Sequence, residues 1–159
     1  MTTFEVISAI VSAIAIIISF VNVIFYRHLT KEYNGLVKEQ NKIAMGQAET
    51  SIRDLIMQAR RHIGDVSAIV AGMDSKNAKS KKIIQDLFES AQEDLRNAYE
   101  EACSRYLDGK VDKERFKKMY HTEIRQLVED KEQNKFYDNI SSRYECTVKV
   151  YTEWCKLEK

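Results

Sequence analysis

Apolar residues fill the beginning of the chain without a break. The run from Val6 to Tyr26 has no charged residue and no proline, and Ile, Val, Ala and Phe dominate it. Because a helix rises about 1.5 Å per residue, this run can cross a hydrocarbon layer about 30 Å thick. The pattern predicts one transmembrane anchor over residues 1–28, and no later run is apolar enough to form a second.

Small and weakly polar residues lie on one stripe of this anchor, at alternating spacings of three and four. Such residues let membrane helices approach and hydrogen-bond, so the stripe predicts a homo-oligomer interface. Alternatively, the serines are merely tolerated, because a serine hydroxyl can bond back to its own helix. An unpaired amide is costly in lipid, which favours the interface. The predicted interface consists of Ser8, Ser12, Ala15, Ser19 and Asn22.

The same spacing continues beyond the anchor, through residues 29–49. The positions on the stripe there are Leu29, Tyr33, Leu36, Gln40, Ile43 and Gln47. We expect one long helix that leaves the bilayer as a short stalk with a half-apolar seam. The alternative is an amphipathic helix that packs on the protein's own cytosolic domain. The two glutamines weaken the coiled-coil interpretation.

Residues 50–159 are predicted to form one helical domain, because apolar residues recur there every three or four positions, the helical period. The connections are short, which implies antiparallel neighbours and a small helical bundle. The expected buried stripes are Ile52, Leu55, Ile56, Ala59, Ile63, Val66, Val70 and Met73; Ile84, Leu87, Ala91, Leu95, Ala98 and Ala102; Phe116, Met119 or Tyr120, Ile124 and Leu127; and Tyr144, Val148, Tyr151, Trp154 and Cys155.

Capping residues predict where these helices begin and end. Gly109 suits the left-handed turn after a helix, and Asp112 can cap the next one. The apolar residues on either side of that cap, Val111 and Phe116, can form a hydrophobic staple. The remaining expected boundaries are the polar break at 74–77, a cap at Ser80, a loop over 130–139, and a last helix that opens at Ser141 or Ser142.

Composition supports an all-α fold and narrows the partners. The chain has no proline and five glycines, whereas strands are usually punctuated by such residues. The formal charge is +1, and Glu5 is the only charged residue before Arg27, so the part from Arg27 onward carries +2. That is too near neutral for a dedicated binder of a DNA or RNA duplex.

The flanks of the anchor predict its orientation. Arg27, His28 and Lys31 follow the apolar run, and no lysine or arginine precedes it, so the C-terminal domain is expected in the cytoplasm, with one pass through the inner membrane. The acidic start and long apolar core are unlike a cleaved secretory signal. The cysteines, Cys103, Cys146 and Cys155, lack metal-ligand spacing and are expected to be reduced.

The sequence contains no catalytic motif. It has no glycine-rich phosphate loop, no HExxH and no nucleophile elbow, and we expect neither an enzyme nor a cofactor or metal. The paired carboxylates, Glu100–Glu101 and Glu129–Asp130, are expected on solvated helix faces.

Basic clusters are the candidate ligand-binding residues. In a symmetric oligomer a cluster is repeated around the axis, and modest charges then form a strong anion site. The alternative is local pairing with glutamate and aspartate at i,i+4. Two nearby tyrosines could stack on a base. The candidates are Arg60 and Arg61; Lys79 and Lys82; and Lys110, Lys113, Lys117, His121 and Arg125 with Tyr106 or Tyr120.

The segment from Asn97 to Cys103 and on through Arg115 to Lys118 resembles part of small membrane-anchored bacterial proteins. In architecture the chain resembles the membrane effectors of antiphage defence, in particular the cyclic-oligoadenylate-binding membrane protein of type III CRISPR systems. This resemblance implies a homo-oligomer, with a tetramer as one stoichiometry, that binds cyclic tetra-adenylate and acts on the lipid bilayer. It transfers no binding residue to a position here. The competing hypotheses are a membrane-tethered scaffold for a partner protein and a tethered enzyme.

Overall fold

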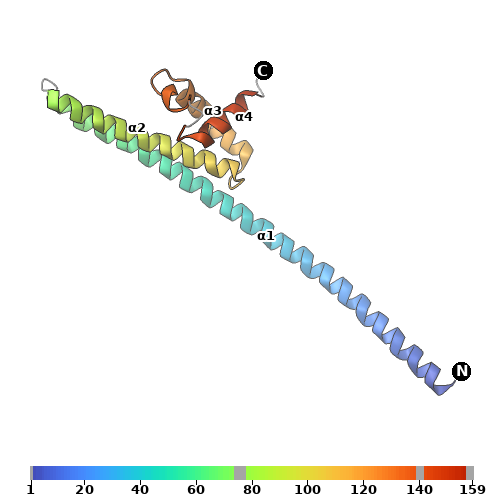
Figure 1. Ribbon diagram of the computed structural model, residues 1–159. Coiled ribbons are helices and arrows are strands. Elements are labelled where there is room, and N and C mark those ends of the chain that lie inside the picture. The colour runs from blue at the N-terminus through green and yellow to red at the C-terminus, as the bar shows by residue number, and fades with distance from the viewer. Residues whose placement is uncertain (1, 74–77, 139–141, 157–159) are drawn as a thin grey trace. The chain divides into compact units, whose positions relative to one another are not determined.

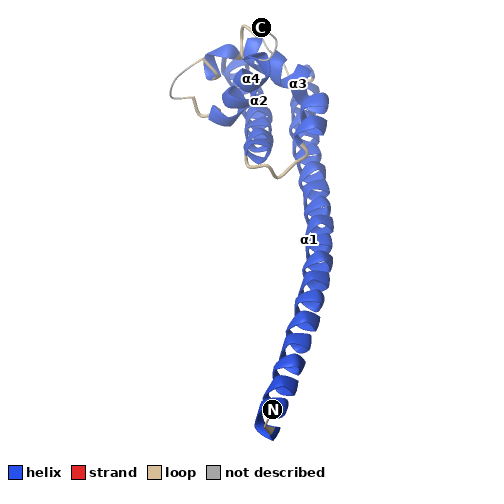
Figure 2. Cartoon of the chain, turned by 90° about the vertical axis from the view of Figure 1, so that its right-hand side faces the viewer, coloured by secondary structure: helices blue, strands red, loops and turns tan. Residues whose placement is uncertain are grey.

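The computed structural model describes residues 2–73, 78–138 and 142–156, without the side chains of residues 5–13, 78 and 156. Its elements are α1 (Thr3–Ala71), α2 (Ala78–Leu107), α3 (Lys113–Glu129), the short 3-10 helix η1 (Asn134–Phe136) and α4 (Glu145–Lys156). Over these residues Figure 2 shows helices and loops and no strand. The expected all-α class is confirmed.

The chain divides into two compact units, residues 1–43 and 44–159. In the first unit the large apolar side chains described for α1 are exposed, among them Ile16 at 69% and Phe20 at 68%. Among the described residues, α1 is the one helix apolar enough to cross a membrane: its most apolar window has a mean hydropathy of 1.3 and none of it is buried. The structure therefore contains one candidate membrane span, near the N-terminus.

The second unit has its own core. The part of α1 after Ala44 and the whole of α2 lie side by side in opposite directions (Figure 1), and small residues at Ala59, Ala98 and Ala102 face the core. α4 packs against both α2 and α3. The buried core residues are Ile52, Ile56, Ala59, Ala98, Tyr99, Ala102, Cys103, Tyr106, Val111, Phe116, Tyr120, Ile124, Val150 and Trp154.

Residues 44–49, which the sequence places in the stalk, lie in this second unit. Ala48 packs against the core. The carboxylate of Glu49 accepts hydrogen bonds from the backbone N–H of Asp112 at 3.1 Å and from Arg115 at 3.0 Å. For these six residues the alternative interpretation applies: the helix packs on its own domain.

The turn between α2 and α3 forms as its residues predict. Gly109 has a φ of 69°, and the backbone N–H groups of Gly109 and Lys110 bond to the carbonyls of Tyr106 and Arg105 at 3.1 and 3.0 Å. This is the Schellman arrangement, which glycine favours because it has no Cβ. Asp112 then caps α3, since its side chain accepts from the backbone N–H of Arg115 at 2.9 Å.

Several helix details differ from the sequence expectation. α2 begins at Ala78, so Ser80 lies inside the helix. α4 begins at Glu145 and not at Ser142. The Ser142 hydroxyl donates to the carbonyl of Phe136 and accepts from the backbone N–H of Tyr144. Ser141 and the expected break at 74–77 lie outside the described residues. The inner face of α4 is Thr147, Val150 and Trp154, while Leu55 of α1 and Met119 of α3 are exposed.

Candidate functional site

The two tyrosines proposed to stack on a base are core residues, and that prediction is wrong. Tyr106 and Tyr120 are 4% and 7% exposed. The Tyr106 hydroxyl donates to Glu153 at 2.9 Å and accepts from the indole N–H of Trp154 at 3.1 Å. The Tyr120 ring packs 4.9 Å from that of Phe116. The tyrosines lie beside lysines in the sequence because α3 is amphipathic, so its rings point inward and its charges outward.

The cations around α3 divide into two groups. Arg125 pairs with Glu129 at 3.1 Å, which is the i,i+4 pairing of the alternative interpretation, and Lys110 pairs at 2.8 Å with Asp108, two residues away. Lys113 and Lys117 instead lie over aromatic rings, with the Lys113 Nζ 4.9 Å from the Tyr106 ring centroid and the Lys117 Nζ 5.9 Å from that of Trp154.

The second group also includes His121, whose ring centroid lies 5.6 Å from that of Trp154. Lys113, Lys117 and His121 are four residues apart and therefore share one face of α3. The structure thus brings three of the predicted ligand-binding residues onto one face, beside aromatic rings that are turned into the core.

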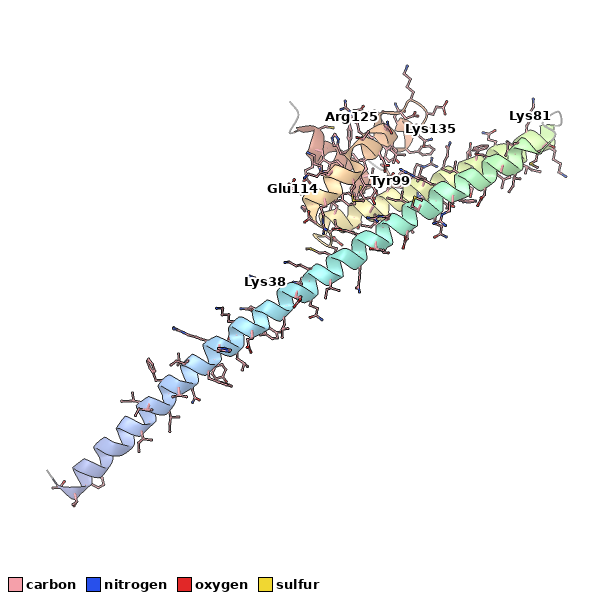
Figure 3. The ribbon with its side chains drawn as sticks, turned by 180° about the vertical axis from the view of Figure 1, so that it is seen from behind. Lys38, Lys81, Tyr99, Glu114, Arg125 and Lys135 are labelled. Carbon is pink, nitrogen blue, oxygen red and sulfur yellow. The ribbon has the colours of Figure 1, made fainter. Side chains whose placement is uncertain are left out.

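Arg60 belongs to a network that joins α1, α2 and α3. Its guanidinium forms an ion pair with Glu123 at 2.6 Å and donates a hydrogen bond to the Tyr99 hydroxyl at 2.9 Å. The Tyr99 hydroxyl in turn donates to the Glu123 carboxylate at 2.5 Å (Tyr99 is labelled in Figure 3). The hydrogen bond to Glu123 raises the pKa of Arg60, while burial and then Glu123 raise the pKa of Tyr99. Arg60 therefore links α1 to α2 through Tyr99 and to α3 through Glu123.

The other predicted cations lie elsewhere on the second unit. Arg61 is exposed on α1, and Lys79 and Lys82 are exposed on the first turns of α2. In Figure 3 Lys81, on the same stretch, lies at one end of α2 and away from Arg125. The lysines at the start of α2 therefore lie apart from the end of α3 that carries Arg125.

Glu100 caps the start of α4, a structural role that the sequence did not indicate. Its carboxylate accepts from the backbone N–H groups of Cys146 at 2.8 Å and Thr147 at 2.9 Å, and from the Thr147 hydroxyl at 2.8 Å. The expectation of a solvated side chain is wrong for Glu100, which lies one helical turn from buried Cys103. It holds for Glu101, which is exposed and pairs with Arg105 at 2.8 Å.

The other carboxylates and the cysteines fit the expectations more closely. Glu129 and Asp130 are exposed, and the hydroxyl of Tyr151, with Arg125, lowers the pKa of Glu129. Burial raises the pKa of the Cys103 thiol to about 12, which keeps it protonated and unreactive. All three cysteines are free.

Arg96 of α2 is the second feature that sequence reasoning missed. It is 4% exposed, although arginine on a helix is normally solvated. Its Nε donates to the Tyr144 hydroxyl at 3.3 Å and its Nη1 to the side-chain oxygen of Gln133 at 2.8 Å. Its guanidinium lies 3.9 Å from the centroid of the Phe136 ring. The only signal in the sequence is its spacing from buried Tyr99 and Cys103 on the same face of α2.

The membrane stripe is described in part. Ala15, Ser19 and Asn22 are exposed, and the side chains of Ser8 and Ser12 are outside the description. The Ser19 hydroxyl donates to the carbonyl of Ala15 at 2.8 Å. At Ser19, therefore, the hydroxyl is satisfied within its own helix, as the alternative interpretation holds.

Within the described ranges no group of three or more His, Cys, Asp or Glu side chains could hold a metal ion. Comparison of the chain with protein-family models, with curated proteins and with solved structures finds no match.

Proposed function

We propose that this protein is a single-pass, self-associating membrane protein that holds a helical bundle at the cytoplasmic face of the inner membrane, where it serves as a scaffold for a partner protein. The observation that carries the proposal is the exposed apolar surface of α1 within the first unit. In a water-soluble protein this apolar surface would be left in contact with water, because the core of the second unit is built from other residues.

The amount of apolar surface supports insertion in a bilayer. Between Ile14 and Phe25, nine large apolar side chains are at least 50% exposed. Moving one such side chain out of water is worth about 1.5–3 kcal/mol, so insertion of the set gains on the order of 10 kcal/mol or more. Arg27 and Lys31 follow the apolar segment, and positive charge on this side favours a cytoplasmic domain.

Self-association is proposed along the stripe that continues through the stalk. Leu29, Tyr33, Leu36 and Ile43 are 51–67% exposed and recur at spacings of four, three and seven. Copies inserted in one membrane with the same orientation are parallel, so equivalent positions face each other at the same height. Asn22 would pair with its symmetry mate inside the bilayer.

The test is membrane extraction of the full chain and two matched double variants. Ile17→Asp with Val21→Asp places two charges at the centre of the span, each costing about 2.5–3.5 kcal/mol, so the protein should become extractable by alkaline carbonate. Leu36→Asp with Ile43→Asp alters the stalk alone, so it should stay in the membrane but lose chemical crosslinking between copies. Membrane retention of the first variant contradicts the anchor, and unchanged crosslinking of the second contradicts the seam.

A cyclic-oligonucleotide sensor is the second candidate, and Lys113 with Lys117 favours it. In the described part of the chain neither lysine forms an ion pair. Repeated around an oligomer axis, they would give a ring of cations suited to phosphates. Titration of the detergent-solubilised protein with cyclic tetra-adenylate tests this function: Lys113→Glu should abolish binding and Lys118→Glu should not. If the wild-type protein does not bind cyclic tetra-adenylate, the sensor function is contradicted and the scaffold function remains the proposal.

A further inference from the structure

Arg96 carries a buried positive charge with neutral partners. Its two hydrogen-bond acceptors are a tyrosine hydroxyl and a glutamine amide oxygen. In the described ranges no carboxylate oxygen lies within the 4.0 Å that defines an ion pair with its guanidinium. Withdrawing a charge from water is expensive, and folded proteins normally place an opposite charge beside it. Burial of this charge among neutral partners therefore favours an anion as a further partner of the guanidinium.

The guanidinium borders an open groove. A groove of about 670 Å³ lies between α2 and the turn that follows α3, and its lining includes Arg96, Gln92, Lys131, Gln133, Lys135 and Phe136. This volume is in the range that small-molecule sites occupy. Figure 3 shows Lys135 on that turn, at the opposite end of α3 from Glu114.

The donors of Arg96 are fixed in place and only partly used. A guanidinium carries five N–H groups. In Arg96 the Nε–H donates to the Tyr144 hydroxyl and one N–H of Nη1 donates to the Gln133 side-chain oxygen. Both N–H groups of Nη2 are left without an acceptor in the part of the chain the structure describes. The Phe136 ring holds the plane of the guanidinium, and Gln92 accepts from the amide of Gln133 at 3.1 Å, which turns the Gln133 oxygen toward Arg96.

The remaining charges of the groove limit what can bind. Glu89, Glu93 and Glu132 also line it, and of these Glu93 is paired with Arg143 at 3.1 Å. In the described ranges neither Glu89, which accepts a hydrogen bond from Gln85 at 3.0 Å, nor Glu132 forms an ion pair. Their charges repel a ligand with several negative charges, such as a polyphosphate, but tolerate one anionic group at Arg96. A planar carboxylate matches the guanidinium fork.

We propose that this groove binds a small molecule through a single carboxylate group, with Arg96 as the buried anchor and Lys131 and Lys135 at the rim. The site goes beyond the proposed scaffold function and does not depend on membrane insertion, so each can fail without the other.

The test uses the full chain in detergent micelles and sodium acetate as the probe. Its thermal unfolding is compared with that in sodium chloride at equal ionic strength, with acetamide as the neutral isostere. Acetate should raise Tm saturably, by a few degrees at ten times its Kd, and acetamide should not. Arg96→Met should remove the saturable part, leaving the general effect of salt.

Variants at the rim separate binding from a structural role of Arg96, and they decide the question if Arg96→Met does not fold. Glu132→Gln removes a repulsive charge and should tighten acetate binding about twofold or more, while Glu114→Gln, outside the groove, should not. Lys135→Gln should weaken binding and Lys118→Gln should not. The proposal is overturned if acetate acts as chloride does, if Glu132→Gln leaves its Kd unchanged, or if pyrophosphate binds more tightly than acetate.

Discussion

Glu100→Ala should be among the most destabilising single substitutions in the second unit. Three donors lose their acceptor at once: two backbone N–H groups at the start of α4 and the hydroxyl of Thr147. Thr147 is 0% exposed, so water cannot take the place of the carboxylate there. An unsatisfied buried donor costs about 1–3 kcal/mol, which gives an expected loss of about 3–5 kcal/mol in the free energy of unfolding.

The assay is denaturant unfolding of the full chain in micelles, followed by tryptophan fluorescence. Trp154 is the one tryptophan of the chain, lies on α4 and is 2% exposed, so its emission reports directly on the helix that Glu100 caps. The control is Glu101→Ala, which removes an exposed i,i+4 pair with Arg105 worth about 0.3–0.5 kcal/mol. A loss below about 1 kcal/mol for Glu100→Ala, or equal losses for both variants, would refute the capping argument.

Three further predictions concern stability. The buried hydroxyl of Tyr137 has no hydrogen-bond partner in the described ranges, so Tyr137→Phe should be neutral or stabilising in the same unfolding assay, whereas Tyr144→Phe removes an acceptor of a buried guanidinium and should cost about 1–3 kcal/mol. Gly109→Ala should destabilise the protein by about 1 kcal/mol, because the φ of Gly109 is 69°. Gly64→Ala should stabilise it by up to about 1 kcal/mol, because Gly64 lies inside α1 and an added Cβ there meets open space. Equal effects of the two substitutions would contradict this reasoning. Burial raises the pKa of Tyr99 above its ordinary value of 10.0, so the unfolded chain loses this proton first and stability should fall as the pH rises past about 10; Tyr99→Phe should flatten that slope.

Local signals were sufficient for much of the fold. The apolar run marks the candidate span, and the alternation of apolar residues marks the helices of the second unit. Gly109 and Asp112 each act through contacts within six residues, and the structure confirms both. Such signals depend on neighbours along the chain, and a sequence displays those neighbours directly.

The candidate site was harder to predict because its polar residues find partners far along the chain. Glu100 bonds to a backbone group 46 residues away, and Arg96 to a side chain 37 residues away. A charged residue on a helix looks solvated until such a partner is known. The same limit explains Thr147, a polar residue with 0% exposure, and the two tyrosines that turn inward beside exposed lysines.

The central claim is that α1 inserts in the inner membrane and leaves the second unit in the cytoplasm. Labelling of intact cells with a membrane-impermeant maleimide tests it most directly, in full-length protein carrying Cys146→Ser and Cys155→Ser, with Cys103 kept because it is buried. Thr3→Cys, at the start of α1, should be labelled without lysis, and Lys118→Cys, exposed on α3, only after lysis. Labelling of Lys118→Cys in intact cells, or protection of Thr3→Cys, would contradict the account.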